Sequence, residues 1–158
     1  MREILKHQEK AYYADSASAT EVPQPPFAGA LFPCLIWDHV GGSDTASKKA
    51  FAQALIRGGC RYAVCAGTDA QSWHDAFDLA REEVSRGMSE EAADREFVMT
   101  SWHDRESVED TAFFFAFNTV FDDHDFTKYL VVHFGGSESE RLRVDEAVRR
   151  EVLGEAAA

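Results

Sequence analysis

The chain has 158 residues, the length of one compact domain, and its 45% apolar residues are enough for a hydrophobic core. Its 16 basic and 28 acidic residues give a formal net charge of −12, a sign that disfavours nucleic acid and anionic membranes as ligands. The composition therefore predicts a soluble domain whose acidic surface would attract a cationic protein partner.

The first 26 residues differ in composition from the rest of the chain. Residues 1–13 are mixed in charge and predict a short polar helix, and residues 14–26 are rich in Ser, Ala, Thr and Pro. We expect residues 1–26 to be an arm and a proline-rich linker outside the core, either disordered or wrapped around a second subunit. No apolar run resembles a secretory signal or approaches the roughly 18 residues of a membrane span, so we expect a cytoplasmic protein.

From residue 27 onward, apolar strands alternate with amphipathic helices. The strands are predicted over 31–37, 61–66, 97–102 and 128–134, and the helices over 48–57, 70–86, 108–120 and 140–153. Capping-box patterns at Thr68–Gln71, Ser107–Asp110 and Ser137–Glu140 support the starts of three of the helices. We therefore expect a single α/β domain over 27–154, with 155–158 as a tail.

The expected architecture is a small three-layer α/β/α domain with a mainly parallel four-stranded sheet, because strict alternation implies right-handed crossovers with helices on both faces. This element order is similar to that of Rossmann-like and flavodoxin-like domains, a resemblance that implies no activity. The strand order 2-1-3-4 is favoured, which makes the strands at 31–37 and 97–102 neighbours at the switch point of the sheet. A 1-2-3-4 order would instead place one strand between them.

Those two predicted strands both end in a tryptophan, and each tryptophan is followed directly by an aspartate and a histidine, in either order. These polar residues are Asp38, His39, His103 and Asp104. Ligands bind at the carboxyl ends of strands in open α/β sheets, so the four side chains would share one rim as a candidate catalytic set. Histidine beside carboxylate suits acid–base work, and His39, His103 and Asp104 could together hold a divalent metal ion.

Other residues after the strands extend this candidate site to a small ligand. They are Gly41, Gly42, Thr68, Asp69, Glu106 and His133. The competing interpretation is structural, because Asp69 and Asp104 stand where helix caps belong and Gly41 and Gly42 suit a tight turn. A third triplet, Trp73-His74-Asp75, falls inside a helix with its tryptophan buried, and it is not counted as part of the site.

Motifs for a nucleophile or a nucleotide are missing from the sequence. The three cysteines form no spaced pair, and two of them fall inside predicted strands, where they suit a core. There is no GxSxG elbow, and although Ser101 lies two residues before His103, the sequence alone supports no serine–histidine–acid arrangement. The phenylalanine-rich helix at 108–120 is apolar on more than one face, which fits either deep packing on the sheet or a subunit interface.

Two functions follow from these observations. The missing motifs favour a binding or protein-interaction module, which would engage a protein partner, a second copy of itself, or a small ligand at the strand ends. The histidine–carboxylate rim favours the alternative, a metal-dependent hydrolase that uses Asp38, His39, His103 and Asp104. The sequence identifies no cofactor other than this divalent metal ion.

Overall fold

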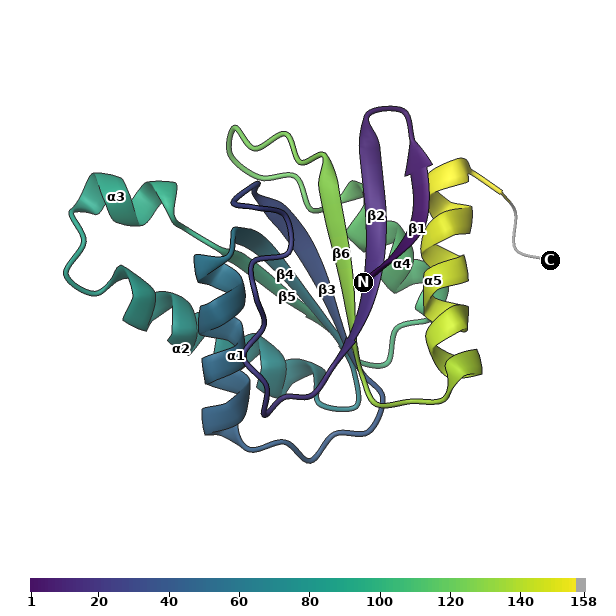
Figure 1. Cartoon of the computed structure of the whole chain (residues 1–158), viewed down its shortest axis with the longest axis horizontal. Coiled ribbons are helices and arrows are strands. Elements are labelled where there is room, and N and C mark those ends of the chain that lie inside the picture. The colour runs from purple at the N-terminus through teal and green to yellow at the C-terminus, as the bar shows by residue number, and fades with distance from the viewer. Residues whose placement is uncertain (156–158) are drawn as a thin grey trace.

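A six-stranded sheet forms the centre of the computed structural model, which describes residues 1–155 (Figure 1). The strands are β1 (Arg2–His7), β2 (Lys10–Ala17), β3 (Phe32–Asp38), β4 (Cys60–Gly67), β5 (Met99–His103) and β6 (Lys128–Phe134), in the spatial order β1-β2-β6-β3-β4-β5. All strands run parallel except β1, which is antiparallel to β2 at one edge. The predicted α/β class with a mainly parallel sheet is confirmed, although the sheet is larger than the four strands expected.

The first two strands replace the polar helix predicted over 1–13, which is wrong. They form a hairpin, and β2 pairs in parallel with β6 inside the sheet. Tyr12 and Ala14 point to one face and Tyr13 to the other, so β2 carries the alternation of a strand. Residues 18–31 then cross one face of the sheet, where Phe27 packs its ring 5.1 Å from that of Phe32. The expected arm is therefore built into the fold.

The helices cover both faces of the sheet, as expected. They are α1 (Thr45–Arg57), α2 (Ala70–Ser85), the short α3 (Glu90–Arg95), α4 (Val108–Phe117) and α5 (Glu138–Leu153). Helices α1 and α2 pack on one face and α4 and α5 on the other (Figure 1). Ser107 and Ser137 cap α4 and α5 as predicted, whereas the residue at the start of α2 is Asp69 and not Thr68. None of the helices within residues 1–155 is long and apolar enough to cross a membrane.

The predicted strand order 2-1-3-4 is wrong. Helices α1 and α2 connect β3 to β4 and β4 to β5 in one direction, and α4 then returns the chain across the other face to β6, next to β3. The four predicted strands therefore lie in the order 4-1-2-3. This moves the switch point of the sheet to the boundary between β3 and β6.

The phenylalanine-rich helix α4 is buried on one side only. Phe115 is fully buried in the core against Tyr129, with ring centroids 5.6 Å apart. Phe113 and Phe117 are 48% and 46% exposed and contact each other on the outer side of the helix. All three cysteines are free and buried, as expected for Cys34 and Cys65, and burial raises the pKa of Cys60 to about 12.

Candidate functional site

The shared rim expected for the four strand-end residues is not formed. Strand β4 lies between β3 and β5, so Asp38 and His39 are separated from His103 and Asp104 by two strand spacings, roughly 10 Å. The prediction that these residues converge is wrong because it depended on β3 and β5 being neighbours. His39 has a different partner, on β6.

A chain of buried and partly buried hydrogen bonds joins the end of β3 to β6 and α5 at the switch point. His39 follows β3, and its Nε2 lies 3.0 Å from Nδ1 of His133 on β6. Nε2 of His133 lies 2.8 Å from a carboxylate oxygen of Asp145 on α5. The other carboxylate oxygen of Asp145 pairs with the guanidinium of Arg2 on β1. Side chains from β1, the end of β3, β6 and α5 thus contribute to one polar network.

The carboxylate sets the proton positions along this chain. Asp145 accepts, so Nε2 of His133 carries a proton and Nδ1 of a neutral His133 is an acceptor for N–H from His39. Burial lowers the pKa of His39, His133 and Arg141 lower it further, and Glu140 and Asp38 oppose them. His39 is therefore neutral at pH 7, with its Nδ1 free of a proton and 3.9 Å from a carboxylate oxygen of Glu140.

Two glycines let the loops after β3 and β6 approach closely enough for the two rings to meet. Gly136 has a φ of +84°, and a Cβ added there would lie 2.7 Å from Cγ of His39. Gly135, with a φ of +67°, would similarly place a Cβ 2.7 Å from the side chain of Val40. The backbone N–H of His39 donates to the carbonyl of Phe134 and ties the two loops together.

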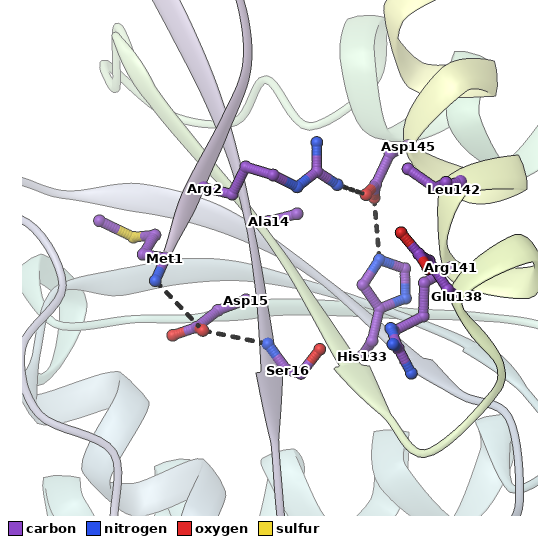
Figure 2. A pocket seen from close by; sticks show the side chains of 10 residues that line it. All are labelled: Met1, Arg2, Ala14, Asp15, Ser16, His133, Glu138, Arg141, Leu142 and Asp145. Carbon is purple, nitrogen blue, oxygen red and sulfur yellow. Dashed lines mark hydrogen bonds and ion pairs between the residues drawn. The ribbon is translucent and has the colours of Figure 1, made fainter.

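A cleft of about 360 Å³ opens beside this network, between β1, β2 and the first turns of α5. Its lining residues are Met1, Arg2, Ala14, Asp15, Ser16, His133, Glu138, Arg141, Leu142 and Asp145. Figure 2 shows Arg2 reaching across from β1 to Asp145, with Asp145 directed at the His133 ring. Ser16 is paired with His133 in the sheet, so its exposed side chain stands beside the imidazole.

Asp38, expected as a catalytic residue, is engaged in local structure. One carboxylate oxygen accepts from the backbone N–H groups of Val40 and Gly41, at 3.1 and 2.7 Å. The other accepts from the indole N–H of Trp73 on the opposite face of the sheet from His133. With both oxygens occupied, Asp38 shapes the turn after β3 and anchors α2.

Four of the expected ligand-binding residues lie around a second ionic cluster, on the side of α1 and α2. The Asp69 carboxylate accepts from the backbone N–H of Gly42 and from the buried ammonium of Lys48, both at 3.0 Å. Lys48 and Gly42 together lower the pKa of Asp69. The backbone N–H of Thr68 donates to the carbonyl of Asp38. These groups fasten the loops after β3 and β4 to each other, and Gly41 leaves room for the approach, since a Cβ added there would lie 2.9 Å from Cγ2 of Thr68.

His103 forms a separate cluster at the far edge of the sheet. Its Nε2 lies 3.0 Å from Oγ of Ser101, and its Nδ1 lies 2.7 Å from a carboxylate oxygen of Glu106. Asp104 is exposed and lines a different hollow, near the start of α2. The expected metal ligands His39, His103 and Asp104 thus occupy three places, and within residues 1–155 no group of three or more His, Cys, Asp or Glu side chains is arranged to hold a metal ion.

The sequence interpretation missed Asp145, Arg2 and Arg141. Asp145 is 3% exposed on α5, between Val144 and Val148, which belong to the buried stripe of that helix. A carboxylate beside an apolar helix stripe is the signal that could have identified it. Arg2 carried no comparable signal, because its role depends on the hairpin that was not predicted.

The pattern of the family DUF7684, a domain of unknown function, matches residues 11–151. The chain therefore belongs to this family. No curated protein and no solved structure matches the chain.

Proposed function

We propose that this member of the DUF7684 family is a binding protein that holds a small zwitterionic ligand of the amino-acid type in the cleft between β2 and α5. The observation that carries the proposal is the buried His133–Asp145 pair in the wall of that cleft, flanked by two arginines. Three features support it: the place of the cleft in the sheet, the energetic cost of burying the His133–Asp145 pair, and the charged groups that line the cleft.

The position of the cleft agrees with the general rule for open α/β sheets. Ligands bind outside the carboxyl ends of strands near a switch point, and His133 lies at the end of β6, one of the two strands that form it. The volume of about 360 Å³ falls in the range of sites for small molecules.

The buried pair is costly to keep for stability alone. His133 is 1% exposed and Asp145 is 3% exposed, so both side chains have lost their hydration. Replacing such a pair with apolar side chains of similar volume is often neutral or stabilising. A polar pair that persists at the wall of a cleft therefore supports a role in binding.

The charges of the cleft select the kind of ligand. Arg2 uses one nitrogen for Asp145 and Arg141 uses one for the carbonyl of Gly136, so each guanidinium has further N–H groups for a carboxylate. Glu138 is exposed at the rim and suits an ammonium group, as does the exposed Asp15, one oxygen of which lies 3.5 Å from the N-terminal ammonium of Met1. With these and Asp145, three carboxylates face two guanidinium groups and the N-terminal ammonium of Met1, a balanced set of charges that favours a ligand with both charges.

The test is a thermal-shift and calorimetry panel of the twenty amino acids, with the matching amines and carboxylic acids as controls. A ligand at about 100 times its Kd stabilises the folded state by roughly 2.7 kcal/mol, which raises Tm by about 5–10 °C for a domain of this size. We expect one or a few amino acids to give such a shift, and their single-charge analogues to give much less.

Variants on α5 show whether the cleft is responsible. Arg141→Gln removes a guanidinium from the cleft, and we expect it to weaken binding at least tenfold. Arg149→Gln is the matched control, because Arg149 lies further along α5, outside the cleft, and pairs with Glu146 and Glu155. A panel without any shift, or equal binding by both variants, would contradict the proposal.

The alternative of a metal-dependent hydrolase has no comparable support. The side chains expected to hold the metal lie in three separate places, and Asp38 has both carboxylate oxygens occupied by N–H donors. We therefore do not extend the proposal to metal-assisted hydrolysis.

A further inference from the structure

We propose that Ser101, His103 and Glu106 form a second site, in which the serine hydroxyl is a nucleophile for acyl transfer from small aryl or short-chain esters. This site is on β5, four strands away from β2 and its cleft, and it uses none of the residues of the ligand-binding proposal. The two proposals therefore succeed or fail independently.

The three side chains have the hydrogen-bond order of a nucleophile, a base and an orienting acid. Ser101 Oγ lies 3.0 Å from Nε2 of His103, and Nδ1 of His103 lies 2.7 Å from Oε2 of Glu106. Both distances are within the reach of a working acid–base chain. With Nδ1–H donated to the carboxylate, Nε2 presents its lone pair to the serine hydroxyl, as proton abstraction requires.

The backbone explains how three residues so close in sequence come together. Ser101 and His103 are two apart on β5, so their side chains lie on the same face of the strand. Arg105 has a φ of +64°, a left-handed conformation that turns the chain back after the strand. This turn brings Glu106 to the far nitrogen of the His103 ring.

The surroundings hold the base rigid and leave the nucleophile accessible. The His103 ring is 7% exposed and packs against Phe114, with centroids 4.4 Å apart. Ser101 is partly exposed on β5, which is an edge strand of the sheet in residues 1–155. An edge strand directs every second backbone N–H away from the sheet, where it can donate to a substrate oxygen.

Tyr62 on β4 supplies a further donor. Its hydroxyl lies close to Ser101, and burial raises its pKa, so the group stays protonated. Its ring contacts Phe114 and Phe121, and Phe121 contacts the partly exposed Phe97. This aromatic surface beside the serine suits an aryl or short acyl group.

The reaction needs only the ester and water. His103 Nε2 takes the hydroxyl proton as Ser101 Oγ bonds to the ester carbon, and the carbonyl π electrons move to oxygen, where Tyr62 donates a hydrogen bond. The intermediate collapses, the ester C–O bond breaks, and the leaving alkoxide takes the proton from His103. Water, deprotonated by His103, then attacks the acyl-serine, and the carboxylic acid leaves as Ser101 regains its proton.

The test is covalent labelling of the full chain by a fluorophosphonate probe, read by peptide mass spectrometry, together with hydrolysis of p-nitrophenyl acetate. We expect one label per chain on Ser101, and an initial burst of nitrophenol. Ser101→Ala should lose both. Ser139→Ala, an exposed serine on α5, should keep both. Circular dichroism melts establish that each variant is folded.

His103 and Glu106 are distinguished by the rate of labelling and by its rescue. His103→Gln should reduce the rate at least a hundredfold. Glu106 acts through His103 as a positioning residue, so Glu106→Gln should lower the rate by less, and Glu106→Asp, which keeps a carboxylate, should recover part of the loss. Absence of a Ser101 label in the folded wild type, or equal rates in wild type and His103→Gln, would overturn the proposal.

Discussion

The coupling between His133 and Asp145 is the most quantitative consequence of the buried network. His133 is 1% exposed, so removing Asp145 leaves its Nε2–H without an acceptor in the protein, and breaking a buried pair in this way costs about 3–5 kcal/mol. Arg2 is more than half exposed and returns to solvent, so it adds little to the penalty. We therefore expect Asp145→Ala to lower the free energy of unfolding by about 3 kcal/mol.

The assay is a double-mutant cycle by urea unfolding, with Asp145→Ala, His133→Ala and the double variant. Each single substitution removes the partner of the other residue, so the double variant should be about 1.5–3 kcal/mol more stable than the sum of the singles predicts. Arg149→Ala and Glu146→Ala form the control cycle, because this pair is much more exposed and should couple by less than about 0.5 kcal/mol. Equal coupling energies in the two cycles would refute the reasoning.

Two further predictions test the contact between the loops after β3 and β6. The pKa of His39 is lowered in the folded state, so the unfolded chain binds a proton at His39 more readily than the folded protein does. The contribution of neutral His39 to stability is therefore complete above the ordinary imidazole pKa of about 6.5. It is lost as the pH falls through the lowered pKa of the folded state. Urea midpoints at pH 7.5 and 5.0 should therefore differ less for His39→Gln than for the wild type. Gly136→Ala should lower the free energy of unfolding by about 1–3 kcal/mol more than Gly87→Ala in the same assay. Both glycines have positive φ, but only at Gly136 would the added Cβ collide with His39. Equal losses in the two variants would mean that the close approach of the two loops does not require a glycine at 136.

From residue 31 onward, every strand and every helix except the short α3 could be predicted from the sequence because their signals are local. The apolar run that ends at Phe134 and the periodic stripe of Trp73 and Phe77 each indicate one element without reference to the rest of the chain. The strand order could not be predicted in this way. It depends on where α4 returns the chain, and both orders satisfy the same alternation and the same handedness.

Individual residues of the candidate site were predicted, but their contacts were not, because these contacts depend on the strand order. His39 and His133 were both identified as residues after or within strands, yet their pairing needed β6 to lie beside β3. Asp145 sits on a helix, away from any strand end, and Arg2 sits in a hairpin whose strands carry many polar residues. His103 and Glu106 were also identified, and their contact depends on the left-handed turn at Arg105, which an arginine does not signal.

The most direct test of the account is the hydrogen bond between the two histidine rings at the switch point. Long-range proton–nitrogen NMR on protein labelled with ¹⁵N at histidine gives the protonation of each ring nitrogen and the coupling across an N–H···N bond. At pH 7.5 we predict protonated Nε2 and unprotonated Nδ1 in both His39 and His133, with a measurable coupling between Nε2 of His39 and Nδ1 of His133. The absence of this coupling, or a neutral His133 with its proton on Nδ1, would contradict the network on which the proposed binding cleft depends.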